Sequence, residues 1–144
     1  MGNADNPSKG AKFEDIVRDF FSREGLALRS NFPVDVGVSS LRKPRKFDLG
    51  CVEPPTIVEG KSHTWTEGGN APSAKLSVWN EAMFYFLMAP PQYRKILAAL
   101  QHSRGDETLA EHYVKRFHHL VPRGVEIWEV AADGKSSRCV HTGS

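Results

Sequence analysis

The chain has 144 residues, of which 40% are hydrophobic and 25% are charged, values that are usual for one globular domain. This composition argues against a disordered or a fibrous protein. The formal net charge of +2 is too small to indicate a nucleic-acid partner by itself. The longest apolar run, residues 82–91, has about half the length that a membrane span needs, and the N-terminus is too polar for a signal peptide. We therefore expect a cytoplasmic protein with no membrane partner, in which Cys51 and Cys139 are reduced and structural.

The first half of the chain predicts one helix followed by three strands. Residues 1–10 contain Gly, Asn, Asp, Pro and Ser with almost no apolar side chains, and they are expected to form a flexible lead. A helix is predicted over residues 11–24, because apolar side chains recur there at helical spacing and Gly25 follows as a stop. The strands are predicted over residues 26–38, 47–52 and 56–64, with a loop over residues 39–46 between the first two.

The second half alternates helices and strands. It predicts a helix over residues 74–89, a strand over 95–101, a helix from a cap at Asp106 or Thr108 to about residue 120, and a last strand over 125–130 before a turn at Asp133. The fold class is therefore a single α/β domain with a mixed central sheet flanked by helices, in the order α-β-β-β-α-β-α-β. We expect this domain to cover residues 11–131 and a polar C-terminal tail to cover residues 132–144.

Three charged residues on two neighbouring predicted strands are expected to meet at one point. Glu59 and Lys61 are two residues apart on one strand, so their side chains lie on the same face. Asp48 lies on the preceding strand, and a hairpin between the two strands would bring its carboxylate to Glu59. Two carboxylates this close repel one another unless a cation lies between them, and Mg²⁺ prefers such oxygen ligands. The residues therefore predict a site for phosphodiester hydrolysis, in which Lys61 orients water or stabilises charge on the phosphoryl group.

The spacing of Asp48, Glu59 and Lys61 resembles the motif of the PD-(D/E)XK, or restriction-endonuclease-like, nuclease superfamily, over about residues 11–130. Phe47 stands where that motif has its proline. The resemblance implies a Mg²⁺-dependent or Mn²⁺-dependent endonuclease with DNA as the favoured substrate, and it is compatible with a homodimer. It also implies that Glu14 on the first helix completes the metal site and that the backbone carbonyl of Gly60 serves as a metal ligand.

The segment after the motif resembles the loop and helix that follow it in small nucleases of this kind. Lys75 and Asn80, with Glu81 third, are candidate polar groups for the site, although the exposed face of any helix supplies such residues. His63, two residues beyond Lys61, is placed to line the site, whereas the histidines from residue 102 onward are interpreted as surface residues. Trp65 has two open interpretations, a platform on which a base stacks and a cover for the core.

Four cations precede Asp48 closely, and they are Arg42, Lys43, Arg45 and Lys46. Two interpretations are open for them, a solvated loop and a loop that holds a phosphate backbone. For the whole chain, the alternative to a nuclease is a non-cleaving nucleic-acid-binding or interaction module on the same architecture. A metal-free protein-binding domain is a third hypothesis, and it requires the two carboxylates to be splayed apart. A purely structural explanation of Glu59 and Lys61 is an exposed salt bridge between them, and it leaves Asp48 unexplained.

Overall fold

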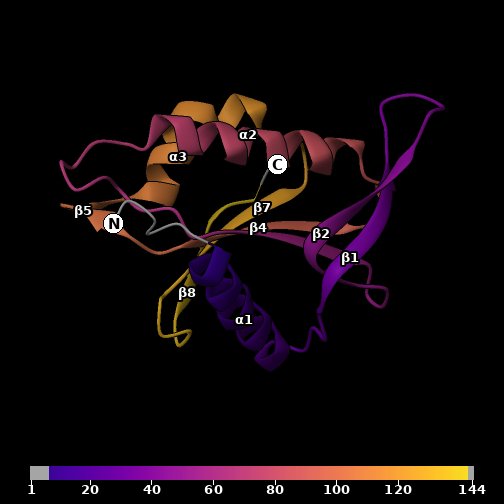
Figure 1. Ribbon diagram of the computed structural model, residues 1–144, viewed down its shortest axis with the longest axis horizontal. Coiled ribbons are helices and arrows are strands. Elements are labelled where there is room, and N and C mark those ends of the chain that lie inside the picture. The colour runs from indigo at the N-terminus through magenta and orange to yellow at the C-terminus, as the bar shows by residue number, and fades with distance from the viewer. Residues whose placement is uncertain (1–6, 143–144) are drawn as a thin grey trace.

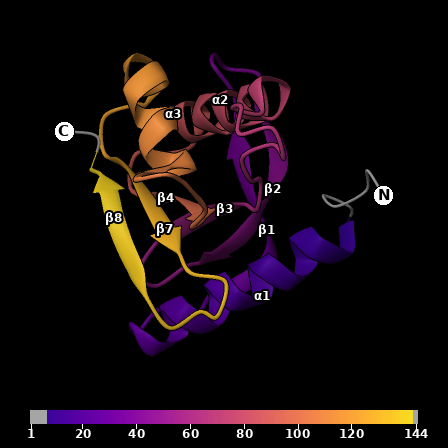
Figure 2. The same cartoon turned by 90° about the vertical axis from the view of Figure 1, so that its left-hand side faces the viewer.

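The computed structural model describes residues 7–142 of the chain. It has three layers, in which a mixed six-stranded sheet lies between α1 on one face and α2 with α3 on the other (Figures 1 and 2). The predicted fold class, an α/β domain with a mixed central sheet flanked by helices, is confirmed. Within the described residues, no helix has the length and apolar character that crossing a membrane requires.

The elements follow one another as α1 (Pro7–Arg23), β1 (Arg29–Val36), β2 (Lys43–Cys51), β3 (Thr56–Lys61), α2 (Ser73–Met88), β4 (Arg94–Leu100), β5 (Ser103–Arg104), β6 (Glu107–Thr108), α3 (Leu109–Phe117), the 3₁₀ turn η1 (His118–Leu120), β7 (Val125–Val130) and β8 (Ser137–His141). The short β5–β6 hairpin, η1 and β8 were not predicted. The predicted tail over residues 132–144 thus contains a strand. The first helix begins at Pro7, so part of the predicted flexible lead is helical, while residues 1–6 of that lead lie outside the described residues.

The sheet has the strand order β1-β2-β3-β4-β7-β8. The three central strands β3, β4 and β7 are parallel, and each of the remaining pairs is antiparallel. Parallel strands need crossover connections, which α2 and α3 provide on the same face of the sheet (Figure 2). The chain thereby brings the ends of β3, β4 and β7 to one edge, next to the N-terminal half of α1.

Side chains alternate along β3 between two hydrophobic cores. Ile57 belongs to the core under α2 and α3, which is centred on Trp79. Val58 belongs to the core under α1, where it packs with Phe13 and Leu49. Both faces of β3 are therefore covered, and any polar side chain on this strand is buried unless it lies near the strand's end.

The predicted loop over residues 39–46 is wrong in its second part, because β2 begins at Lys43 and pairs there with β1. Val36 pairs with Lys43, and Asp35 pairs with Pro44. Strand β3 pairs with β2 only from Leu49 to Cys51, so the first half of β2 has an open side. Proline lacks a backbone N–H and is tolerated at such an open edge, which explains how a strand includes Pro44.

Candidate active site

The candidate site lies where β2 and β3 separate. Their backbone pairing runs from Cys51 opposite Thr56 to Leu49 opposite Val58 and stops there. Beyond this point, carboxylate oxygens accept the hydrogen bonds of backbone N–H groups. The backbone N–H of Asp48 donates to Oε2 of Glu59 over 3.0 Å, and the backbone N–H of Gly60 donates to Oδ2 of Asp48 over 2.8 Å. The two acidic side chains are thus fixed beside one another at the point of separation, as the hairpin argument predicts.

Helix α1 brings a third carboxylate to the same place. The side chains of Glu14 and Asp48 both lie beside Gly60. A Cβ built on Gly60 would be 3.9 Å from Oδ2 of Asp48 and 3.9 Å from Cγ of Glu14. The structure therefore places Glu14 where the resemblance implied it, in contact with Asp48 and next to the backbone of Gly60.

The pKa values of Glu14 and Asp48 are both raised. Burial, followed by the charges of Asp48 and Glu59, raises the pKa of Glu14 to about 7. Burial and the charge of Glu59 also raise the pKa of Asp48, although the N–H of Gly60 and the charge of Lys61 act in the opposite direction. A cation bound between Glu14 and Asp48 would offset the charge repulsion that raises both pKa values.

Glu59 is buried, with 3% of its side chain exposed, and is bound by Arg45. Nη1 and Nη2 of Arg45 donate to the two carboxylate oxygens over 3.0 and 3.2 Å, in the forked geometry that guanidinium groups favour. The guanidinium carbon lies 4.7 Å from the ring centre of Phe47 and 4.0 Å from that of Tyr85. Arg45 was predicted to be a phosphate contact. Its guanidinium instead lies against these two rings, and both of its terminal nitrogens bind Glu59.

Lys61 lies at the end of β3 with 12% of its side chain exposed. Its Nζ is 4.0 Å from Oε1 of Glu59, because the two residues are on the same face of the strand. This agrees with the predicted placement of the amine beside the carboxylates. Glu59 is buried and Lys61 is largely covered, so the alternative of an exposed salt bridge is wrong.

The other candidate residues, from the segment after the motif, do not converge on the carboxylates. Nδ1 of His63 accepts a hydrogen bond from the indole N–H of Trp79 over 2.9 Å, which ties His63 to α2. Lys75 and Glu81 are exposed on α2. The amide oxygen of Asn80 accepts from the hydroxyl of Tyr113 over 2.7 Å, which directs this side chain toward α3.

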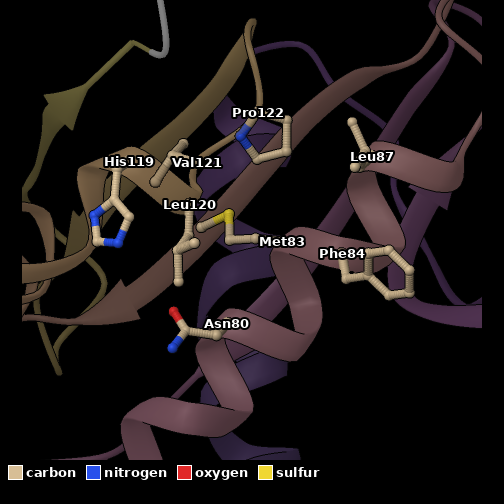
Figure 3. Close-up of a pocket in the computed structure, with 8 residues that line it drawn as sticks. All are labelled: Asn80, Met83, Phe84, Leu87, His119, Leu120, Val121 and Pro122. Atoms are coloured by element: carbon tan, nitrogen blue, oxygen red, sulfur yellow. The ribbon is translucent and has the colours of Figure 1, made fainter.

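Asn80 also lines an apolar groove between α2 and η1, together with Met83 and Leu120 (Figure 3). Its assignment to the site is therefore corrected. Successive residues of a helix point about 100° apart around its axis. The apolar stripe of α2 shows which side faces the core, but it does not show which of the polar residues beside the stripe lies near the site.

Two of the predicted nucleic-acid contacts are engaged elsewhere. The guanidinium of Arg42 donates to the backbone oxygens of Gly37, Asp35 and Met88, and it thereby ties the β1–β2 turn to the end of α2. Trp65 is only 5% exposed, and the guanidinium carbon of Arg104 lies 3.9 Å from the centre of its ring. Trp65 therefore covers the core, and its interpretation as a stacking platform is wrong.

Of the four cations, Lys43 and Lys46 are exposed on β2 and remain candidates for phosphate contacts. The role of Arg45 as the partner of Glu59 was missed. A strand that begins at Lys43 places Arg45 and Phe47 on one face by alternation, so the signal was present but depended on the strand boundary.

The fit of the site to Mg²⁺ or Mn²⁺ rests on two carboxylates. No group of three or more His, Cys, Asp or Glu side chains within residues 7–142 is arranged to hold a metal ion. Glu14 and Asp48 do converge, however, and Mg²⁺ is commonly bound through one or two carboxylates, with water and substrate oxygens completing its shell. The excess of three carboxylates over the two cations Arg45 and Lys61 also suits a cation. The residues present therefore fit the expected metal through Glu14 and Asp48, with Glu59 held by Arg45.

Comparison with known proteins finds no matching family model, no matching curated protein and no matching solved structure. The resemblance to PD-(D/E)XK nucleases accordingly rests on the residues of this chain and on their arrangement.

Proposed function

We propose that this chain is a metal-dependent nuclease that hydrolyses phosphodiester bonds, with DNA as its favoured substrate. The observation that carries the proposal is the convergence of Glu14 and Asp48 at the end of the β2–β3 ladder, with Lys61 beside them. The pKa values of Glu14 and Asp48 are both raised, and groups with such perturbed pKa values are more common in functional sites than elsewhere. The order in which a helix and two strands supply these residues supports a restriction-endonuclease-like fold.

In this proposal each residue has a separate task. Glu14 and Asp48 hold Mg²⁺ or Mn²⁺, and the backbone carbonyl of Gly60 is a further ligand. The bound cation supplies an activated water and offsets charge on the phosphoryl group. The ammonium of Lys61 stabilises the negative charge that develops on the phosphoryl oxygens. In the net reaction the water oxygen bonds to phosphorus, one P–O ester bond breaks, and a water proton ends on the leaving oxygen.

Arg45 acts as a positioning residue for Glu59. Its two hydrogen bonds keep the carboxylate of Glu59 beside the backbone N–H of Asp48 and within 4.0 Å of Nζ of Lys61. Because Glu59 is buried, this pairing also prevents an uncompensated charge inside the domain. A homodimer and a cytoplasmic location remain parts of the proposal, since each of two symmetric cuts would require its own site.

The same ion pair favours a second candidate function. Arg45 donates to both carboxylate oxygens of Glu59, an arrangement that would also suit a module that binds nucleic acid without cutting it. The two candidates differ in one respect that can be measured, which is metal-dependent cleavage.

The test is cleavage of labelled DNA oligonucleotides by the pure chain in Mg²⁺ or Mn²⁺, compared with cleavage in EDTA. We expect cleavage only with metal, and we expect Asp48→Asn to abolish it. Asp35→Asn is the matched control, because Asp35 is exposed on the neighbouring strand β1 and lies outside the site. If the parent chain binds DNA but leaves it intact in both metals, the non-cleaving module is the better account. If Asp48→Asn cuts as fast as Asp35→Asn, the assigned site is wrong.

A further inference from the structure

A second cavity adjoins the candidate site on the α1 face of the sheet. Its volume is ≈ 270 Å³, close to the lower limit for small-molecule pockets. Lys9, Lys12 and Ile16 of α1 form one wall. Ser62, which follows β3, and Ala132, which follows β7, form the other. Figure 2 shows the β7–β8 connection against α1, and the guanidinium of Arg23 donates to the backbone oxygen of Gly134 there.

The cavity and the site share a wall. Phe13 lines the cavity, and its Cδ2 lies 3.8 Å from the place where a Cβ on Gly60 would stand. Phe13 also precedes Glu14 in the chain. A phosphodiester held beside Glu14, Asp48 and Gly60 would therefore have one of its neighbouring nucleotides next to the cavity.

The lining of the cavity combines an apolar surface with positive charge. Phe13, Ile16 and Ala132 are apolar, and Lys9 and Lys12 are three positions apart on one face of α1. No carboxylate is among the described residues that line it. A nucleotide has the matching chemistry, because its base is flat and largely apolar on its faces and its phosphate is an anion.

We propose that this cavity binds one unpaired nucleotide next to the scissile phosphate, so that the substrate is single-stranded DNA or DNA with an unpaired base at the cleavage point. This inference rests on the proposed function. A base inside a duplex is stacked and paired, and it must leave the stack before it can enter such a cavity. The cavity therefore discriminates against intact duplex, and Lys9 and Lys12 hold the phosphate of the bound nucleotide.

The test measures binding without cleavage, by fluorescence anisotropy in Ca²⁺, with a labelled single strand and with a blunt duplex of the same sequence. Ala132→Trp fills the cavity from an exposed position, and Ala27→Trp is the matched control at an exposed alanine beyond the other end of α1. We expect Ala132→Trp to weaken binding of the single strand about tenfold and to leave duplex binding unchanged. Equal affinities of Ala132→Trp and Ala27→Trp for the single strand would overturn the proposal, as would an equal loss for both DNA forms.

A second variant keeps the test decisive if Ala132→Trp fails to fold. Lys12→Ala should weaken single-strand binding and reduce the slope of log K against log salt by about 0.7, whereas Lys115→Ala on the opposite face of the sheet should not. An unchanged slope for Lys12→Ala would count against the cavity. Cleavage separates the two proposals. If the single strand binds through the cavity but is not cut in Mg²⁺ or Mn²⁺, the nuclease function fails while the nucleotide site stands.

Discussion

Two buried glutamates, Glu59 on β3 and Glu129 on β7, are each paired with an arginine, but different groups surround the two ion pairs. Their side chains are 3% and 0% exposed, and each is bound by an arginine from the adjacent antiparallel strand, Arg45 on β2 and Arg138 on β8. Oε2 of Glu129 also accepts from the hydroxyl of Thr108, and Oε1 accepts from the side-chain amide of Gln101 over 3.3 Å.

The difference lies in what surrounds each ion pair. Glu129 has neutral donors and an arginine, so its charge is compensated and its oxygens are satisfied. Glu59 is next to Asp48 and near Glu14, whose pKa values are both raised, so its region keeps an excess of negative charge. A buried carboxylate with an arginine is therefore not by itself a sign of function. The unbalanced carboxylates beside it distinguish the Glu59 region as a candidate site and the Glu129 region as a structural one.

The largest effect is expected from Lys61→Ala, which removes the ammonium group from the candidate site. Single-turnover cleavage of DNA should fall by at least about a hundredfold, the range for loss of one charge-stabilising group, while DNA binding in Ca²⁺ stays nearly intact. Lys95→Ala is the matched control, because Lys95 is a partly buried lysine on the neighbouring strand β4. Equal cleavage rates for the parent and Lys61→Ala at saturating metal would remove Lys61 from the site.

The two arginines provide the next comparison. Arg45→Gln and Arg138→Gln each leave a buried carboxylate without its cation, and each should lower the free energy of unfolding by about 2 kcal/mol or more. Mg²⁺ should restore stability to Arg45→Gln, because a cation bound at Glu14 and Asp48 also offsets the charge of Glu59. It should not restore Arg138→Gln. Urea unfolding with Mg²⁺ and with EDTA measures both, and equal rescue of the two variants would contradict the distinction between the regions.

The pH dependence of stability should differ in sign between the regions. The folded pKa of Glu14, about 7, lies above the usual value of 4.5, so protonation of Glu14 stabilises the fold below about pH 4.5 and this contribution is lost as the pH rises through 7. Glu14→Gln should therefore be more stable than the parent at pH 8 in EDTA, by about 1 kcal/mol after allowance for solvent screening. The two proteins should converge near pH 5. A parent that is as stable as Glu14→Gln at pH 8 would show that the carboxylates do not repel one another.

Glu111 is the control for that experiment. Its hydrogen bonds from the backbone N–H of Thr108 and from Arg138 lower its pKa, so its contribution to stability is present above pH 4.5 and is lost as the pH falls further. Glu111→Gln should then destabilise the protein slightly at pH 8, in the direction opposite to Glu14→Gln. The opposite signs exclude a general effect of removing one negative charge.

The smallest effect is expected from the exposed lysines of β2. Lys46→Ala should weaken DNA binding severalfold and reduce its salt slope by about one, because one phosphate contact is lost. Lys135→Ala, an exposed lysine in the β7–β8 connection, should leave the slope unchanged. A slope that does not change in Lys46→Ala would place the DNA on another surface.

The convergence of Asp48, Glu59 and Lys61 could be predicted from the sequence because it depends on short-range rules. Alternation along β3 fixes which residues share a face, and a short connection makes β2 its antiparallel neighbour. The position of Glu14 came from the family resemblance, and the contact of α1 with β3 places it beside Asp48.

Other features depend on tertiary pairing that local patterns do not reveal. Arg45 was assigned to a loop because Pro44 and a run of cations are typical of loops, and only pairing with β1 shows that they belong to a strand. Strand β8 has few apolar residues in sequence, and it is stabilised by pairing with β7, where Arg138 lies opposite Glu129. Asn80 was misassigned because its neighbour in space, Tyr113, is far away in the chain.

The most direct test of the central claim is a crystal structure of the chain grown with Mn²⁺, with anomalous difference density measured at the manganese absorption edge. The account predicts a peak between the carboxylates of Glu14 and Asp48, beside the backbone carbonyl of Gly60, with Arg45 still bound to Glu59. Crystals in saturating Mn²⁺ that show Glu14 and Asp48 joined by a hydrogen bond, with no anomalous peak beside them, would contradict it.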